Sequence, residues 1–586
     1  MNNGDEDSTA GQPHVDGDYS SDQVEREMSV AAAKAAAEQA RRRAHEALVA
    51  AAEQSKGEKL TIKTASGWVH GRMEETDGRL VRSWRGIPFG ADTSGENRFR
   101  APRPAPSWEG IRYCNEFGPV APQPTYSWQD RIIGSEDCLH LDVVRPDTDE
   151  QLPVVVYFHG GSFIVGSSHM LMLRGFQLAE AMNVVYVSIN FRLGALGYLD
   201  LRSLSDECVA NPAVMDQLLA LQWVQENISA FGGDPDCVTA MGESAGGAAV
   251  LTLMASPAAK GLFHRAIAQS SPIGMIHSRT QSTFWARELV KRMALPRGTT
   301  VDALREAVSD DIVRAGQSMM WRNGELLHLN SSYAPTVDGE LLPDHPLEVF
   351  ARGEQLDIPL LIGTNSDEAS FSKFMFQRGH IRQRAAIRLL ASFDENNARG
   401  VVDAYDGAID RADFAELLAD ALFWAPSIRI AQTHALQNST WMYRFSYASK
   451  ALRALGLGAM HSMELSNVFG DMTASRASLL LRMGSAEEMD ELTELMQRHW
   501  ASFIHGGRPG DEWPQYTTSA SQAKFDVSEE ASARRATMMF DIPHHLEFDP
   551  RRERRKAWND YNMLEWGLGR PDILAEIEFL LEGFRP

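Results

Sequence analysis

A serine between two glycines ends an apolar stretch near the middle of the chain. Residues 238–247 read Val-Thr-Ala-Met-Gly-Glu-Ser-Ala-Gly-Gly, which places Ser244 at the centre of a Gly-x-Ser-x-Gly pattern. A serine hydroxyl is a weak nucleophile unless a base activates it and donors stabilise the developing oxyanion. A strand, a sharp turn and a helix hold such a hydroxyl clear of the backbone, and Gly242 and Gly246 suit the crowded turn. The pattern predicts a nucleophile elbow, but five residues alone can occur by chance in a chain with 45 glycines.

A glycine-rich loop follows a second apolar stretch upstream. Residues 153–158 form a continuous apolar run, which is typical of a strand buried on both faces of a parallel sheet. The next residues are His159, Gly160, Gly161, Ser162 and Phe163. Loops of this kind point backbone N–H groups into a cavity, so the segment is a candidate for the second half of an oxyanion hole.

Strand, loop and helix patterns alternate around these two motifs. We expect strands over 184–190 and 358–362 and a helix over 216–228. An N-terminal hairpin is expected from strands over 61–69 and 80–84, on either side of a turn at Thr76-Asp77-Gly78. This alternation is that of an α/β protein with a parallel sheet.

Composition excludes several classes of protein. The 586 residues carry a formal net charge of -22, which disfavours nucleic acid as a partner, and the one strongly basic run, 551–556, is interpreted as a solvated or ion-paired surface. No run of eighteen apolar residues predicts a membrane span. Four scattered cysteines provide no zinc-binding pattern and no disulfide framework. Neither a metal nor an organic cofactor is expected.

The N-terminus differs from the rest of the chain. Residues 1–22 are acidic and lack Lys and Arg, so we expect a disordered tail there. Residues 23–56 form an alanine-rich helical extension, which could stand apart from the domain or associate with a second copy through residues 23–54. The folded domain is expected over 57–586. No secretory signal is visible, so cytoplasmic residence is the default expectation.

Several motifs in a fixed order resemble the type-B carboxylesterase family. They are Ser135-Glu136-Asp137-Cys138-Leu139, Asn190-Phe191-Arg192-Leu193-Gly194, Asp216-Gln217, residues 231–235 and the elbow itself. The resemblance covers roughly residues 58–565. It implies an α/β-hydrolase fold with a mostly parallel central sheet flanked by helices. Amphipathic helical patterns dominate residues 278–351 and 373–453, and we expect these insertions to cover the active site.

The resemblance supplies partners for Ser244. Its Gly-x-Asn-x-x-Glu motif matches residues 363–368 and makes Glu368 the acid, with Asp367 as a rival. The loop that delivers the base matches residues 459–470 and makes His461 that base. The triad order Ser, Glu, His along the chain agrees with this fold.

Other residues are assigned supporting roles by the same resemblance. The oxyanion would be held by backbone N–H groups of Gly161, Ser162 and Ala245. Glu243, Ser270 and Glu464 would surround the triad, and His159 would hold the glycine-rich loop. Two ion pairs that pin nearby loops are expected, Arg98 with Glu136 and Arg192 with Asp216.

The chain also departs from the family pattern. Secreted members pair the cysteine that matches Cys138 with an upstream cysteine, but residues 118–122 read Gly-Pro-Val-Ala-Pro. A bridge from Cys138 to Cys114 stays open, and the loss of the usual partner agrees with a reducing cytoplasm. Ser162 replaces a third glycine. Trp128 lies where cholinesterases bind the cationic alcohol, although a packed tryptophan is the simpler interpretation. Aromatic residues of the insertions, such as Trp285 and Trp424, belong either to the core or to pocket walls.

The resemblance implies a serine carboxylic-ester hydrolase that acts through an acyl-enzyme. Its substrates would be small to medium apolar or aromatic esters, with carbamates or amides as further candidates. The alternative is a catalytically silent binding module of the same fold. Because candidates exist for all three triad positions, hydrolysis is the favoured hypothesis.

Overall fold

The computed structural model describes residues 59–125, 131–295, 301–321, 331–374, 379–471, 485–518 and 534–564. The chain divides into two compact units, Met1–Thr61 and Ile62–Pro586, and only residues 59–61 of the first are described. The predicted acidic tail (1–22), the predicted extension (23–56) and Trp128 lie outside the described residues.

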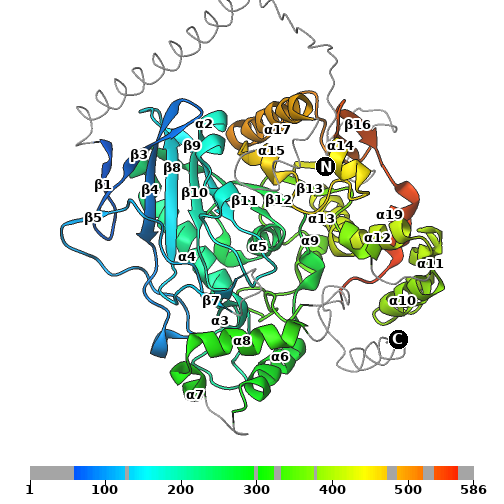
Figure 1. Cartoon of the computed structure of the whole chain (residues 1–586), viewed down its shortest axis with the longest axis horizontal. Helices are drawn as coiled ribbons and strands as arrows, with labels where there is room; N and C mark the ends of the chain where they lie inside the picture. The colour runs from blue at the N-terminus through cyan, green and yellow to red at the C-terminus, as the bar shows by residue number, and fades with distance from the viewer. Residues whose placement is uncertain are drawn as a thin grey trace, which may run out of the picture. The chain divides into compact units, whose positions relative to one another are not determined.

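An eleven-stranded sheet forms the centre of the second unit (Figure 1). Its strand order is β16-β15-β14-β13-β12-β11-β9-β10-β8-β4-β3. The strands are β3 (Arg72–Thr76), β4 (Arg79–Pro88), β8 (His140–Pro146), β9 (Leu152–Phe158), β10 (Val185–Ile189), β11 (Gly233–Glu243), β12 (Arg265–Gln269), β13 (Leu360–Asn365), β14 (Thr440–Phe445), β15 (Ala536–Phe540) and β16 (His545–Phe548).

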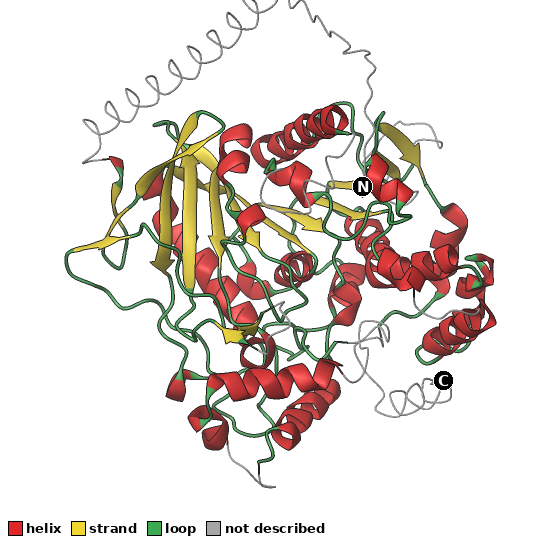
Figure 2. Ribbon diagram, in the orientation of Figure 1, coloured by secondary structure: helices red, strands yellow, loops and turns green. Residues whose placement is uncertain are grey.

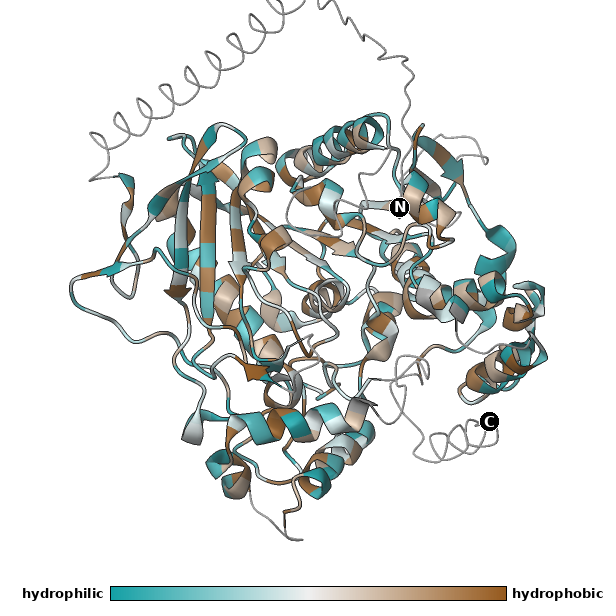
Figure 3. Ribbon diagram, in the orientation of Figure 1, coloured by the Kyte–Doolittle hydropathy of each residue, from teal (hydrophilic) through white to brown (hydrophobic). Residues whose placement is uncertain are grey.

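The middle of this sheet is parallel and its edges are antiparallel. Strands β10, β9, β11, β12, β13, β14 and β15 pair in parallel, whereas β16 and the β8-β4-β3 side pair antiparallel. The parallel strands are apolar along most of their length, as Figure 3 shows, because both of their faces are covered. The expected mostly parallel α/β sheet is confirmed.

Helices cover both faces of the sheet (Figure 2). On one face, α2 (Phe176–Met182), α15 (Leu465–Phe469) and α17 (Ala486–Gly506) share a buried cluster with strand residues that include Tyr157 and Met241. On the other face lie α4 (Pro212–Asn227), α5 (Ala245–Met254) and α13 (Ala425–His434). This arrangement places α5 against β9, β11 and β12, where it can fix the end of β11.

The remaining elements lie around this centre. The helices are α3 (Gly194–Gly197), α6 (Arg279–Arg292), α7 (Val301–Glu306), α8 (Ser309–Trp321), α9 (Pro346–Arg352), α10 (Gly379–Ala391), α11 (Ala398–Asp403), α12 (Arg411–Ala419), α14 (Lys450–Ala454) and α19 (Arg552–Asp560). A five-residue π-helix, η9 (Asp420–Trp424), joins α12 to α13. The small strands are β1 (Thr61–Lys63), β2 (Trp68–His70), β5 (Ile111–Tyr113), β6 (Gln123–Pro124) and β7 (Ile132–Ile133).

Two expectations about secondary structure need correction. The hairpin turn lies at Asp77-Gly78 as predicted, but its first strand is β3 rather than residues 61–69. Gly71 lies between β2 and β3. A side chain does not fit there, because a Cβ would lie 2.4 Å from the carbonyl oxygen of Ser83. The second insertion, 373–453, was expected to be helical, yet it contains β14 of the central sheet. The long helical pattern that precedes this six-residue buried strand obscured it.

Candidate active site

Ser244 occupies a sharp turn between β11 and α5. Its backbone has φ 56° and ψ -124°, a region that residues with a side chain rarely adopt. The Ser244 N–H donates to the carbonyl of Gln269 on β12 at 2.9 Å, which ties the turn to the neighbouring strand. A Cβ at Gly246 would lie 1.9 Å from the carbonyl oxygen of Phe158, and one at Gly242 would lie 2.4 Å from that of Gly246. Both glycines are therefore required by the close approach of backbone.

His461 connects the serine to a carboxylate. Its Nε2 lies 2.9 Å from Ser244 Oγ, and its Nδ1 lies 2.6 Å from Glu368 Oε2. The three predicted side chains thus form one continuous hydrogen-bonded chain. Three separate segments supply these side chains. The turn after β11 carries Ser244, the residues after β13 carry Glu368, and the loop before α15 carries His461.

Glu368 is held by donors on its second oxygen. Glu368 is 2 % exposed, and its Oε1 accepts from Asn365 N at 2.7 Å and from Ser270 Oγ at 2.6 Å. The rival Asp367 points elsewhere, because its Oδ2 accepts from Ser366 Oγ and from the N–H of Ala459. Glu368 rather than Asp367 therefore faces the imidazole.

Glu243 adds a second carboxylate beside the imidazole. Its Oε1 lies 3.3 Å from His461 Nε2 and accepts from Ser462 Oγ at 2.6 Å. Burial raises the pKa of Glu243, whereas the charge of His461 and the Ser462 hydroxyl lower it. Burial alone would lower the pKa of His461, but the negative charges of Glu243 and Glu368 outweigh this and raise it above its ordinary value.

Glu464 lies behind the triad and is fully buried. Its Oε2 accepts from Asn365 Nδ2 at 2.6 Å, and its Oε1 accepts from Gln269 Nε2 at 3.2 Å. Burial, reinforced by the nearby charge of Glu243, raises the pKa of Glu464 to about 8. These hydrogen bonds connect the ends of β12 and β13, and the carbonyl of Gln269 in turn accepts from the Ser244 N–H.

The glycine-rich loop lies directly against the serine turn. A Cβ at Gly160 would lie 3.1 Å from Ser244 Cβ, so the two backbones touch. Gly161 and Ser162 have φ of 119° and 55°, and the N–H groups of Ile164 and Val165 both donate to Gly161 O. Within the described part of the chain, no hydrogen bond occupies the backbone N–H of Gly161, Ser162 or Ala245. These three groups are available to a ligand oxygen.

His159 packs under this loop. Its ring stacks on Phe191 with centroids 4.4 Å apart, and its Nδ1–H donates to Gly160 O at 2.9 Å. Burial lowers the pKa of His159 to about 4, so the ring is neutral at neutral pH. These contacts agree with the expectation that His159 supports the loop.

Phe423 is a site residue that the sequence did not indicate. Its ring stacks on His461 with centroids 4.6 Å apart and an interplanar angle of 28°. Phe423 belongs to the π-helix η9, so the second insertion does reach the triad. The neighbouring Trp424 and the earlier Trp285 are 3 % and 1 % exposed and belong to the core.

Two buried ion pairs confirm the sequence expectation. Arg98 binds both carboxylate oxygens of Glu136, and Arg192 binds both oxygens of Asp216 at 2.8 and 2.6 Å. Arg192 also donates to the carbonyls of Arg100 and Pro212, so its guanidinium anchors two loops at once.

The four cysteines form no disulfide bond with one another. Cys114, Cys138 and Cys208 are buried, Cys237 is partly buried, and all four are free, so the open Cys114–Cys138 bridge is absent. Over the described residues, no three His, Cys, Asp or Glu side chains gather in a way that could hold a metal ion. None of the helices in the described segments has the length and apolarity needed to cross a membrane.

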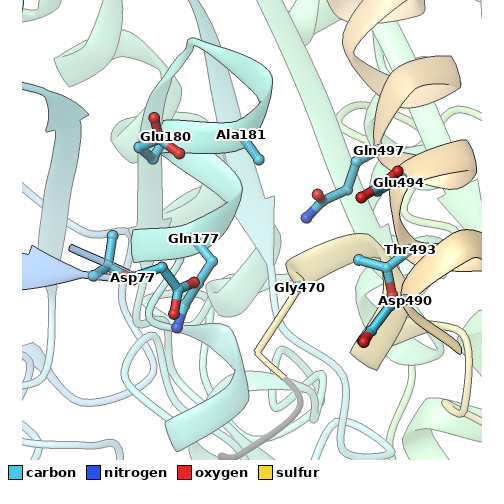
Figure 4. A pocket seen from close by; sticks show the side chains of 10 residues that line it. Asp77, Gln177, Glu180, Ala181, Gly470, Asp490, Thr493, Glu494 and Gln497 are labelled. Carbon is cyan, nitrogen blue, oxygen red and sulfur yellow. The ribbon is translucent and has the colours of Figure 1, made fainter. Parts of the chain in front are cut away.

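A hollow of about 240 Å³ lies between α2 and α17 and is separate from the triad (Figure 4). Its polar lining includes Asp77, Gln177, Glu180, Asp490, Glu494 and Gln497. No residue of the hydrogen-bonded chain lines it, so it is not a substrate pocket for Ser244.

Comparison with known proteins agrees with this geometry. Residues 58–541 match the model of the carboxylesterase family. The chain belongs to this family. The carboxylesterase shares 33 % identity over 498 residues with the para-nitrobenzyl esterase of Bacillus subtilis (strain 168), which covers 83 % of this chain and 96 % of that protein. It shares 31 % identity over 523 residues with carboxylesterase 1D of Rattus norvegicus, over 81 % of this chain and 90 % of that protein.

Solved structures show the same fold. A PNB esterase structure superposes on this carboxylesterase with a TM-score of 0.75 and 31 % identity, covering 85 % of this chain and 99 % of that one. The expected α/β-hydrolase fold is confirmed. The protein is a carboxylic ester hydrolase, and hydrolysis through an acyl-enzyme is general in its family.

Proposed function

We propose that Ser244, His461 and Glu368 carry out the hydrolysis as nucleophile, general base and orienting acid. The single observation that supports these roles is the hydrogen-bonded chain from Ser244 Oγ through both ring nitrogens of His461 to Glu368 Oε2. A nucleophile, a base and a group that orients the base are the three parts that serine acyl transfer requires.

The mechanism follows from these contacts. His461 Nε2 takes the proton of Ser244 as Oγ attacks the ester carbonyl, and then gives it to the leaving alcohol. Glu368 accepts the Nδ1–H hydrogen bond and stabilises the cation that forms. The oxyanion is bound by the N–H groups of Gly161, Ser162 and Ala245, each contributing about 2 to 4 kcal/mol to the transition state. Water then attacks the acyl-enzyme by the same route.

Labelling with a fluorophosphonate tests this proposal. The reagent reacts with a serine only when its hydroxyl is activated, so the full chain should be labelled once and Ser244→Ala should not be labelled. This result also separates the hydrolase from a catalytically silent binding module, for which no labelling is expected. Equal labelling of both proteins would refute the assignment of Ser244.

The substrates we propose are small to medium apolar or aromatic esters, with carbamates and amides as further candidates. The name of the Bacillus subtilis relative, a para-nitrobenzyl esterase, supports an aromatic alcohol group. A panel that varies acyl and alcohol size independently measures both preferences. Uniform inactivity toward neutral esters, with turnover of charged ones, would contradict this choice.

Glu243→Gln tests the electrostatics of the base. The base works only when neutral, so activity rises as pH rises through its pKa. Removing the negative charge 3.3 Å from His461 Nε2 removes one cause of the raised pKa, and the acidic limb of the kcat/KM profile should move to lower pH. The control is Glu340→Gln, which changes an exposed carboxylate and should leave the limb in place. If the acidic limb of Glu243→Gln stays in place or moves to higher pH, the role given to this charge is contradicted.

We further propose that the protein resides in the cytoplasm and that residues 23–54 mediate self-association. Four free cysteines support a reducing compartment. The alanine-rich composition of 23–54 supports pairing with a second copy. Cell fractionation tests the cytoplasmic location. Deletion of residues 1–56 tests the self-association. It should lower the sedimentation coefficient from that of an oligomer to that of a monomer. An unchanged oligomeric state would contradict this proposal.

A further inference from the structure

Asn365 lies where the segments that carry the acid and the base meet. It is the last residue of β13, three residues before Glu368, and it is 1 % exposed. Its backbone N–H donates to Glu368 Oε1 at 2.7 Å. Every residue type except proline provides such an N–H. The side chain of Asn365 is therefore not needed to hold the acid.

The side-chain amide of Asn365 donates to the segment that carries the base. Its Nδ2 lies 2.7 Å from Met460 O and 2.6 Å from Glu464 Oε2. These two acceptors stand on either side of His461 in the sequence. A carbonyl oxygen can only accept, so the amide nitrogen rather than Oδ1 must face Met460. Both N–H groups of the amide are thus used on the base side.

The carbonyl of Met460 belongs to the peptide unit that precedes His461. Because a peptide unit is planar, turning this carbonyl also turns the backbone that carries the imidazole. His461 lies in neither a helix nor a strand, so no regular ladder of hydrogen bonds fixes this plane. Met463 N donates to the same carbonyl at 3.3 Å from within the turn. Among the described residues, Asn365 supplies the only hydrogen bond to it from another part of the chain.

The second acceptor extends the connection to the serine. Glu464 Oε1 accepts from Gln269 Nε2 at 3.2 Å, and Gln269 O accepts from the Ser244 N–H at 2.9 Å. We propose that the side chain of Asn365 acts as a positioning group in this hydrolysis, by holding the loop of His461 where the imidazole reaches both of its triad partners. The proposal rests on the roles given to the triad, and Asn365 itself touches no reacting atom.

The same contacts affect the charge of the base. Glu243 at the end of β11, Glu368 after β13 and Glu464 before α15 all act on His461; burial lowers its pKa, but these negative charges raise it above its ordinary value. Burial raises the pKa of Glu464, and the hydrogen bond from Asn365 lowers it. Losing the amide should loosen the contact between His461 and Glu368 and favour neutral Glu464. Both changes lower the pKa of the base.

Asn365→Leu tests the proposal in the full chain. Leucine has a similar size but no N–H donor, and the backbone N–H that holds Glu368 stays in place. With a nitrophenyl ester, kcat should fall about 10- to 100-fold, because a small displacement of a catalytic group has a cost of this order. KM should stay within about threefold, since no contact with the substrate is removed. The acidic limb of the kcat/KM profile should move to lower pH.

Asn211→Leu is the matched control. Asn211 is 2 % exposed and precedes α4, and its Nδ2 donates to the carbonyl of Thr336 and to Asp338 Oδ2, both at 2.9 Å. The substitution therefore removes bonds to the same two kinds of acceptor, a carbonyl and a carboxylate, away from the contacts of the triad. Thermal unfolding should show a loss of stability in both variants, whereas kcat and the acidic limb should change only in Asn365→Leu.

Equal kcat in Asn365→Leu and the unaltered chain, or equal losses in both variants, would overturn the proposal. So would a loss of kcat with an unmoved acidic limb, because a weakened fold lowers the active fraction without changing the pKa of the base. If circular dichroism shows that Asn365→Leu is unfolded, Asn365→Ser decides by the same criteria, since its hydroxyl is too short to reach Met460 O.

The rate of fluorophosphonate labelling separates this proposal from the triad roles. An unaltered chain that is not labelled would refute the roles of the triad. If the unaltered chain is labelled and Asn365→Leu is labelled more slowly, the positioning role is supported. Labelling of both at the same rate would refute the role of Asn365 alone.

Discussion

Replacing Ser244 by alanine is expected to abolish hydrolysis of a nitrophenyl ester, with kcat lower by about 10⁴- to 10⁶-fold. The change removes the hydroxyl that we propose forms the acyl-enzyme, and it leaves His461 and the proposed oxyanion donors in place. The fold should survive, because the loss is one oxygen at a residue that is 8 % exposed. Initial rates with the purified full chain measure the effect, and circular dichroism measures the fold.

Ser256→Ala is the matched control for this experiment. Ser256 lies two residues after the end of α5, at the opposite end of the helix from Ser244, and it is 1 % exposed. The same atom is thus removed from a buried serine of the same helical segment without touching the site. Turnover should be retained in this control. Comparable turnover in Ser244→Ala and Ser256→Ala would exclude Ser244 as the nucleophile.

Glu368→Gln should lower kcat by about 10⁴-fold with little change in fold. Glutamine can preserve the bonds from Asn365 and Ser270, but it provides no negative charge for the imidazolium and does not select the Nδ1–H tautomer of His461. Single-turnover acylation with a nitrophenyl ester measures the affected step.

Asp367→Asn provides the comparison that distinguishes the two neighbouring acids. Asp367 contacts Ser366 and Ala459 rather than the imidazole, and asparagine can still accept from the Ala459 N–H. Its kcat should stay within about tenfold of the unaltered value, equivalent to about 1.4 kcal/mol in the barrier. A larger loss in Asp367→Asn than in Glu368→Gln would reverse the assignment.

The elbow was predictable from sequence because its constraint is steric and local. Gly242 and Gly246 are required by carbonyl oxygens within 2.4 Å of their hypothetical Cβ atoms, and no other residue type satisfies that requirement. The parallel strands were predictable for a similar reason, since burial on both faces demands an apolar run. Strand β14 escaped detection because its six residues follow a long helical pattern.

The acid could not be assigned from the residues alone. Asp367 and Glu368 are adjacent and chemically alike, and the direction of the chain after β13 decides which of them faces His461. The resemblance to the family indicated Glu368, but the physical cause is the pair of donors, Asn365 N and Ser270 Oγ, that hold its second oxygen. Asn365 is close to Glu368 in the sequence, but Ser270 comes from the distant end of β12, and spacing alone does not reveal that the fold brings its hydroxyl to this carboxylate.

Phe423 was missed for a different reason. Helical periodicity assigns positions on a face by a repeat of 3.6 residues, and the π-helix η9 breaks that repeat. Trp424, the more conspicuous aromatic residue in the sequence, is buried in the core instead.

The π-helix also makes chain length a determinant of the site. A turn of this helix contains about one residue more than an α-helical turn, so loss of one residue from Asp420–Trp424 would shift α12 and α13 to α-helical spacing relative to each other. Residues on one side of the deletion would then rotate by about 100° relative to those on the other. Either Phe423 would lose its stacking contact with the imidazole of His461, or Asp420 would lose its hydrogen bonds from Arg551, although no side chain is substituted. Insertions and deletions in this short segment can therefore reshape the wall beside the base as strongly as substitutions can.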